Sequence, residues 1–136
     1  MIYAVIDTNV IIAAAKSHKP DSSTSRIIGL VNAGVIRPLV CREILEEYIQ
    51  ILNLPILAIP TELSMSILST FIVDGIYMER VESHESFPDP TDQVFYEIAL
   101  SVEDAYLVTN NIKHFPKKPL VVTPSEMLVI LSEQGI

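Results

Sequence analysis

Cysteine and long apolar runs are scarce in this chain of 136 residues. Cys41 is the only cysteine, so an internal disulfide is impossible and a reducing compartment is favoured. No run approaches the roughly 18 uninterrupted apolar residues of a membrane span. Asp7 interrupts the apolar N-terminal segment and no basic segment precedes it, which argues against an export signal. We therefore expect a cytoplasmic protein that does not enter membranes.

Basic residues are also few. The chain has 9 Lys and Arg against 17 Asp and Glu, which gives a formal net charge of −8. Because nonspecific affinity for phosphates comes mostly from Lys and Arg, this balance argues against a large, generic nucleic-acid-binding face. It leaves open the cleavage of phosphodiesters through bound cations, since Mg²⁺ and Mn²⁺ prefer hard oxygen ligands.

The rest of the composition predicts a folded chain with a proper core. A hydrophobic content of 49% excludes a disordered chain, and the length suits one domain over residues 1–136. Strand-like apolar runs alternate with helix-period segments, which predicts an α/β fold with a central parallel sheet flanked by helices. We expect strands at residues 2–6, 35–40, 76–81, 105–108 and 120–122, and helices at 10–15, 22–34, 42–53, 60–74, from 89 onward and at 127–131.

Asp7 is the first candidate for chemistry because it directly follows the first expected strand. In open α/β sheets, ligands gather beyond the carboxyl ends of parallel strands. Thr109, Asn110 and Asn111 follow the expected strand 105–108, so they should share one edge of the sheet with Asp7. Asp7 would also make a good helix N-cap, and this structural role stays open as an alternative.

A second candidate, Asp92, lies in the first turn of the helix that Asp89 is expected to cap. Helical spacing places Asp92 on the same face as Phe95 and Ala99, which should point inward. A buried carboxylate without a partner is costly, so Asp92 needs backbone donors, a cation or a water-filled cleft. A purely structural role explains Asp89 well and Asp92 only partly.

The helix expected at 42–53 offers three glutamates. At about 100° per residue, Glu43 falls opposite the apolar stripe of this helix and should be solvated. Glu46 and Glu47 border the stripe on its two sides, so spacing does not decide which of them enters a cleft. An ordinary exposed glutamate remains the alternative for both.

Four segments together resemble the PIN domain family. Asp7-Thr8-Asn9 after an apolar strand is similar to the opening motif of the family, and Glu47 is similar to its second acidic position. Asp92 corresponds to the third acidic motif, and residues 107–116 resemble the fourth as it occurs in a bacterial branch of toxin components. The resemblance implies a three-layer, Rossmann-like α/β fold.

The resemblance also implies a metal-dependent endoribonuclease that hydrolyses RNA. In it Asp7, Glu47 and Asp92 would hold Mg²⁺ or Mn²⁺, directly or through waters. Asn9 and Thr109 would position the carboxylates by hydrogen bonds, although both residue types also make turns.

Asn111 is the departure from the family pattern, because many PIN domains have an aspartate there. Its carbonyl oxygen can ligate or orient a water but brings no negative charge, which leaves the number of bound ions open.

The partners implied by the resemblance are an RNA substrate, an antitoxin protein and a second copy in a homodimer. Two alternatives stay open. One is a PIN-like binding module that lost turnover through Asn111, and the other is a phosphotransfer domain with Asp7 as nucleophile, for which Asn9 stands in place of a second aspartate.

The chain has no aromatic-rich platform for stacking bases. Candidate contacts to an RNA backbone are Lys16, His18, Lys19, Lys113, His114, Lys117 and Lys118.

Overall fold

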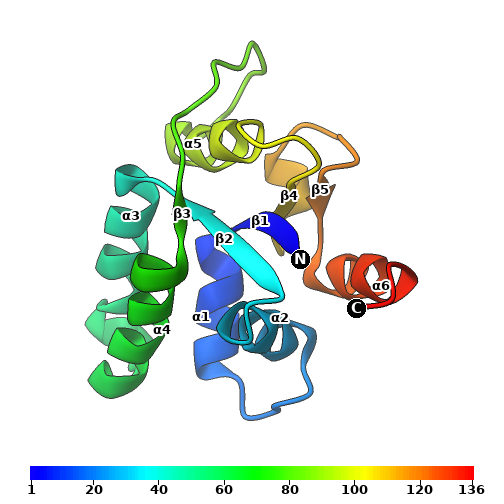
Figure 1. The fold of residues 1–136 in the computed structure, drawn as a ribbon. Helices are drawn as coiled ribbons and strands as arrows, with labels where there is room; N and C mark the ends of the chain where they lie inside the picture. The colour runs from blue at the N-terminus through cyan, green and yellow to red at the C-terminus, as the bar shows by residue number, and fades with distance from the viewer.

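A five-stranded parallel sheet forms the centre of the computed structural model, which describes residues 1–136 (Figure 1). The strand order is β3-β2-β1-β4-β5, and each neighbouring pair runs parallel. The chain builds the sheet outward from β1 to β3, and then continues on the other side of β1. The order therefore reverses between β1 and β4, and open α/β sheets bind ligands at the carboxyl ends of the strands at such a point. The strands are β1 (Ile2–Ile6), β2 (Ile36–Val40), β3 (Ile76–Tyr77), β4 (Tyr106–Val108) and β5 (Val121–Val122).

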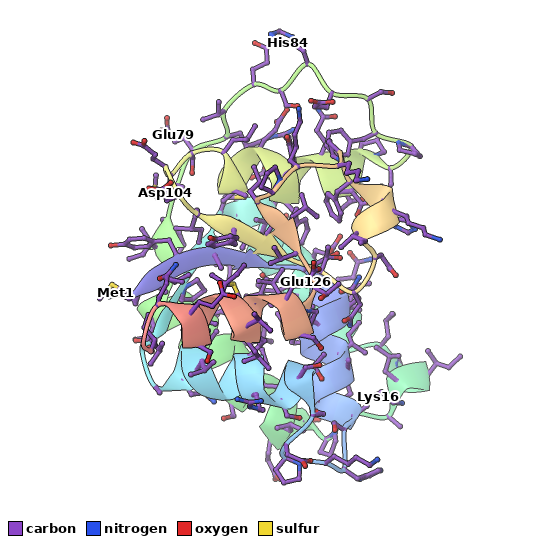
Figure 2. The ribbon with its side chains drawn as sticks, turned by 90° about the vertical axis from the view of Figure 1, so that its right-hand side faces the viewer. Met1, Lys16, Glu79, His84, Asp104 and Glu126 are labelled. Atoms are coloured by element: carbon purple, nitrogen blue, oxygen red, sulfur yellow. The ribbon has the colours of Figure 1, made fainter.

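Helices cover both faces of this sheet. One face carries α5, the opposite face carries α1, α2 and α6, and α3 and α4 pack together beside the β3 edge (Figures 1 and 2). This arrangement of helix, sheet and helix confirms the predicted three-layer α/β fold. None of the helices is both long enough and apolar enough to cross a lipid bilayer. The helices are α1 (Thr8–Lys16), α2 (Ser23–Asn32), α3 (Arg42–Leu52), α4 (Thr61–Asp74), α5 (Pro90–Ala99) and α6 (Pro124–Glu133), with short 3₁₀ turns η1 (Pro55–Leu57) and η2 (Ile112–His114).

The apolar runs of the sequence became strands because both faces of the sheet are covered. Val5, Ile6 and Leu107 are fully buried, as the continuous apolar runs at 2–6 and 105–108 predicted. Among the buried polar residues, Asp7 directly follows β1 and Thr109 directly follows β4. The carboxyl end of the sheet is therefore the place where chemistry is expected.

Local signals set the helix boundaries as predicted. Thr123 and Glu126 form a reciprocal capping box at the start of α6. Asp89 caps α5 by accepting a hydrogen bond from the N–H of Thr91. Gly34, with φ at +78°, follows α2 in the left-handed region that favours glycine, and so ends the helix.

One strand is shorter than predicted. The apolar pattern predicts a strand at 76–81, but β3 ends at Tyr77 because its partner β2 ends at Val40. The last ladder-like bond runs from the N–H of Met78 to the carbonyl of Val40 (2.9 Å). Beyond it the chain leaves the sheet, and Val81 donates its N–H to the carbonyl of Glu97 on α5 (3.3 Å). The prediction was wrong for residues 78–81 because sequence pattern carries no information about the length of the neighbouring strand.

Candidate active site

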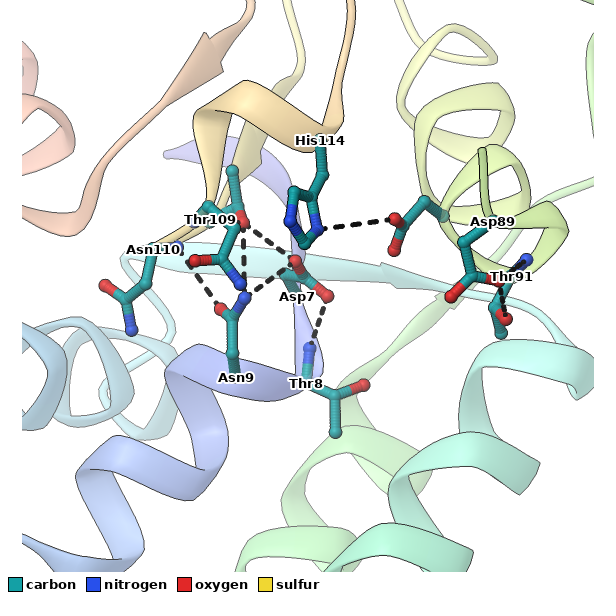
Figure 3. Close-up of polar contacts among 10 residues, drawn as sticks. Asp7, Thr8, Asn9, Asp89, Thr91, Thr109, Asn110 and His114 are labelled. Carbon is teal, nitrogen blue, oxygen red and sulfur yellow. Dashed lines mark hydrogen bonds and ion pairs between the residues drawn. The ribbon is translucent and has the colours of Figure 1, made fainter. Parts of the chain in front are cut away.

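Asp7 and Thr109 meet at the point where the strand order reverses. The register pairs Ile6 of β1 with Val108 of β4, so the residues that follow each strand lie side by side. The N–H of Asp7 extends the ladder to the carbonyl of Val108 (2.9 Å). The Thr109 hydroxyl donates to Oδ2 of Asp7 (2.7 Å), as Figure 3 shows. The predicted convergence of these polar groups at one edge of the sheet is therefore present.

The Asp7 carboxylate has a structural role and keeps one vacant acceptor position. Oδ1 caps α1 by accepting from the N–H of Thr8 (2.8 Å), while Oδ2 accepts from Thr109 and from Nδ2 of Asn9 (3.1 Å). A carboxylate has about four acceptor sites, so about one remains for a water or a cation. The capping role left open by the sequence and a role in chemistry are compatible.

Asn9 and Thr109 hold this carboxylate in position. Asn9 also accepts from the N–H of Asn110 (3.2 Å), and Thr109 accepts from the N–H of Asn111 (3.0 Å). Both side chains therefore tie the start of α1 to the segment after β4. These are the contacts expected of residues that orient Asp7.

Glu47, not Glu46, faces Asp7. The Thr8 hydroxyl donates to Oε2 of Glu47, whereas Glu46 pairs with Arg42 on the surface of α3 (2.8 Å). The predicted solvation of Glu43 is confirmed, since its side chain is 53% exposed. The sequence left open whether Glu46 or Glu47 enters the site, and the hydrogen bond from Thr8 on α1 shows that it is Glu47.

Asp92 comes from α5 on the other side of the site. Its side chain is 19% exposed, in agreement with the predicted inward orientation. Oδ2 of Asp92 lies 3.7 Å from Nδ1 of His114, which projects from η2 toward it (Figure 3). We refer to Asp7, Glu47 and Asp92 as the acidic cluster.

The three carboxylates of the acidic cluster influence one another. Burial is the main reason that the pKa of Asp7 rises from 3.8 to about 6; the Thr109 hydrogen bond lowers it, and the charges of Asp92 and Glu47 raise it further. Burial likewise raises the pKa of Glu47, and the charge of Asp92 adds to that rise. The pKa of Asp92 is also raised, by burial and then by Asp89, against the lowering effect of His114. The cluster is a place of uncompensated negative charge.

Asn111 is not held in the site. Its side chain makes no hydrogen bond and is exposed, and only its backbone N–H contacts Thr109. The amide is therefore free to turn toward or away from a ligand near Asp7.

A PIN domain model matches residues 3–113, which is most of the chain. The chain belongs to the PIN domain family. No curated protein and no solved structure gives a significant match. PIN domains are generally nucleases, and they typically use divalent metals.

The acidic cluster of this PIN domain fits a divalent metal in its chemistry. Its donors are carboxylate oxygens, which Mg²⁺ and Mn²⁺ prefer, and no Lys or Arg forms an ion pair with any of the three. No group of three or more His, Cys, Asp and Glu side chains stands in an arrangement that could hold a metal ion. An ion at the acidic cluster would therefore have to be held largely through its own waters, several of which Mg²⁺ usually keeps.

Two contacts near the site of this PIN domain have no signal in the sequence pattern. Tyr48 is fully buried, and its hydroxyl donates to the carbonyl of Ile6 at the end of β1. This bond fixes α3 against β1 and so positions the neighbouring Glu47. The approach of His114 to Asp92 likewise joins two segments that only the fold brings together.

Replacing Thr109 by Val is expected to raise the pKa of Asp7 above its present value of about 6. The substitution keeps the shape and removes the hydroxyl, whose hydrogen bond is the largest influence lowering that pKa. An NMR pH titration of the Asp7 carboxyl carbon in metal-free protein measures the change. Thr70→Val is the control, because the Thr70 hydroxyl bonds only the carbonyl of Ser66 on α4. An unchanged or lower Asp7 pKa in Thr109→Val would contradict the assignment.

Proposed function

We propose that this PIN domain is a divalent-metal-dependent endoribonuclease whose active site is the acidic cluster. The observation that carries the proposal is the buried Asp7 carboxylate at the β1–β4 reversal, with a pKa raised to about 6 and repelled by Glu47 and Asp92. Keeping such charges together lowers the stability of the fold. Carboxylates with strongly perturbed pKa values are found most often at functional sites. Membership of the PIN domain family supports the same assignment.

In this proposal each residue has a defined task. Asp7 would bind Mg²⁺ or Mn²⁺ through its remaining acceptor site, and Glu47 and Asp92 would contribute directly or through waters. A bound cation would supply a more acidic attacking water and offset negative charge on the phosphodiester. Thr109 and Asn9 fix the Asp7 carboxylate, and the Thr8 hydroxyl fixes Glu47. Because these hydrogen bonds hold the carboxylates of Asp7 and Glu47 in place, the carboxylates need little rearrangement when substrate binds.

The neutral side chain of Asn111 favours one tightly held ion over two. It supplies no charge for a second cation, and no hydrogen bond holds its amide near Asp7. We therefore assign Asn111 the task of orienting a water or a phosphate oxygen.

The adjacent glutamates of α3 provide a matched test of the proposal. Glu47→Gln is expected to lower Mg²⁺-dependent cleavage of single-stranded RNA by more than about 10-fold, because the change removes a charge that faces Asp7. Glu46→Gln should cleave like the wild type, since Glu46 contacts only Arg42 at the surface. Gel analysis of labelled RNA with Mg²⁺, and with EDTA, measures both. Cleavage that survives EDTA, or that falls equally in the two variants, would count against the proposal.

A binding module without turnover is the second candidate. Several large apolar side chains of η1 and α4 are exposed, with Ile56 at 87%, Met65 at 64% and Val73 at 75%. Exposed apolar surface of this kind is typical of partner binding, and an antitoxin protein or a second copy would suit it. Tight, metal-independent binding of a partner by a chain that cleaves no RNA would favour this candidate. The phosphotransfer alternative is weaker, because Asn9 stands where such a domain needs a second aspartate.

A further inference from the structure

A pocket lined by lysines lies beside η2. Its volume is about 340 Å³, and Lys113, Lys117 and Lys118 line it together with Ile112, Phe115 and Pro116. We refer to it as the lysine pocket. The chain has 5 lysines in all, so more than half of them gather around this one hollow of an acidic protein.

Two of these lysines have no partner within the protein. Lys113 and Lys117 are exposed, and neither side chain forms a hydrogen bond or an ion pair. Lys118 differs, because its Nζ lies 3.6 Å from Oε1 of Glu85. An unpaired ammonium group beside a pocket is available to an anionic ligand.

The other basic groups of the chain are mostly engaged elsewhere. Arg42 pairs with Glu46, Arg80 pairs with Glu97, and Lys16 donates to the carbonyl of Leu57. Lys16 also lies at the far end of α1 from Asp7, about 13 Å along the helix. Free positive charge near the sheet edge is therefore concentrated at the lysine pocket.

The lysine pocket and the acidic cluster share the η2 turn. Lys113 lines the pocket, and the next residue, His114, reaches toward Asp92 (Figure 3). Successive side chains of a 3₁₀ turn point in different directions, about 120° apart, so one turn serves both sites. The two sites are therefore joined by adjacent residues of one turn.

The walls of the pocket also suit a nucleotide. Ile112 is 43% exposed and offers an apolar surface, and Phe115 is buried and packs edge-on against Phe87 (6.3 Å between ring centroids). Phe115 thus forms a fixed floor instead of a stacking platform. Such a pocket would accept a base or ribose without selecting its identity.

We propose that the lysine pocket binds one nucleotide of single-stranded RNA next to the linkage that is cleaved, with Lys113 and Lys117 on its backbone phosphate. The inference rests on the proposed nuclease function. Its physical reason is electrostatic: RNA is repelled by a protein of net charge −8 and by the acidic cluster, so binding requires a local region of positive charge. An acidic partner protein would need a wider basic surface than this pocket provides.

The test measures RNA binding with no metal present. Fluorescence anisotropy of a short, labelled single-stranded RNA in EDTA gives the Kd, and its salt dependence gives the number of phosphate contacts. For Lys113→Gln with Lys117→Gln, we expect a Kd about 10-fold higher and a slope of log K against log salt reduced by about 1.4, because each contact on a single strand contributes about 0.7. Arg26→Gln is the matched control, because Arg26 is exposed on α2 and does not line the lysine pocket; its Kd should stay within about twofold.

Replacement of the same two lysines by Arg separates charge from folding. The Arg variant keeps the positive charges and is expected to restore wild-type affinity and slope. An unchanged Kd and slope in the Gln variant would overturn the inference. Equal weakening by Arg26→Gln would also overturn it, because binding would then reflect diffuse charge.

The binding assay and the cleavage assay can fail separately. Lysine-dependent RNA binding without Mg²⁺-dependent cleavage would support the pocket and reject the nuclease. If Glu47→Gln lowers cleavage but the substitutions of Lys113 and Lys117 leave RNA affinity unchanged, the pocket proposal alone is rejected.

Discussion

Asp7→Asn is expected to reduce Mg²⁺-dependent cleavage more than about 100-fold and at the same time to stabilise the metal-free protein at neutral pH. The two effects have one cause. The ionised Asp7 carboxylate is useful only with a cation, and without one it is buried beside two other negative charges. Asparagine keeps the shape and the cap on α1 but removes the charge.

The pH dependence of this stability follows from the sign of the pKa change. Asp7 has a pKa of about 6 in the folded protein against 3.8 for an unperturbed carboxyl. Between these values the folded state binds more protons than the unfolded state, so the free energy of unfolding falls as pH rises. The loss is complete above about pH 6 and amounts to about 3 kcal/mol.

Urea unfolding of wild type and Asp7→Asn between pH 4 and about 7.5 measures this difference. Glu47 and Asp92 also have raised pKa values, and both carboxylates remain in the variant, so the difference between the two proteins reports the Asp7 charge together with its repulsion of Glu47 and Asp92. The variant should gain about 1–2 kcal/mol at neutral pH, less than the full amount because the new amide faces the donor Nδ2 of Asn9. Added Mg²⁺ should stabilise only the wild type. A variant that is inactive and less stable than wild type at every pH would contradict the account.

Glu97→Ala is expected to lower the free energy of unfolding by about 3 kcal/mol. Glu97 is 4% exposed and accepts hydrogen bonds from Arg80 (2.8 Å), from the N–H of Ser83 (2.9 Å) and from Gln93 (2.9 Å). Burial alone would raise the pKa of Glu97, but the bonds from Gln93, Ser83 and Arg80 outweigh it and lower that pKa. This carboxylate fastens the segment after β3 to α5. Without it, three donors lose their partner at once.

Two measurements check this loss. Urea unfolding gives the free energy, and hydrogen exchange should become faster at the N–H of Ser83. Because the pKa of Glu97 is lowered in the folded state, its contribution is present above the unperturbed value of 4.5 and declines as pH falls below it. The difference in the free energy of unfolding between wild type and Glu97→Ala should therefore become smaller at acidic pH. Glu85→Gln is the control, because Glu85 lies on the same segment and is exposed; it should lower the free energy of unfolding by less than about 1 kcal/mol. An equal loss of stability in the two variants would contradict the role of Glu97.

Sequence pattern predicted the sheet because burial on both faces imposes apolar runs. The run at 2–6 became β1, and Asp7 followed it at the edge where ligands bind. The pattern also separated Asp89 from Asp92, because capping preferences assign the first and helical periodicity orients the second. These are local properties, and local properties can be read along the chain.

Contacts between distant segments could not be read in this way. Glu46 and Glu47 are adjacent and border the same apolar stripe, so only the Thr8 hydroxyl from α1 distinguishes them. Glu97 lies in a helix segment where residues 94–99 are all buried, and its charge among apolar neighbours was the one available signal. One of its partners, Arg80, comes from the segment that the apolar pattern assigned to a longer β3.

The shortness of the two outer strands affects how copies of this protein can associate. β3 and β5 have two residues each, so either border of the sheet offers few unpaired N–H and carbonyl groups to an incoming strand. Natural sheets use brief outer strands to prevent edge-to-edge growth. Self-association of this chain by strand pairing, including amyloid-like stacking through the sheet, is therefore disfavoured.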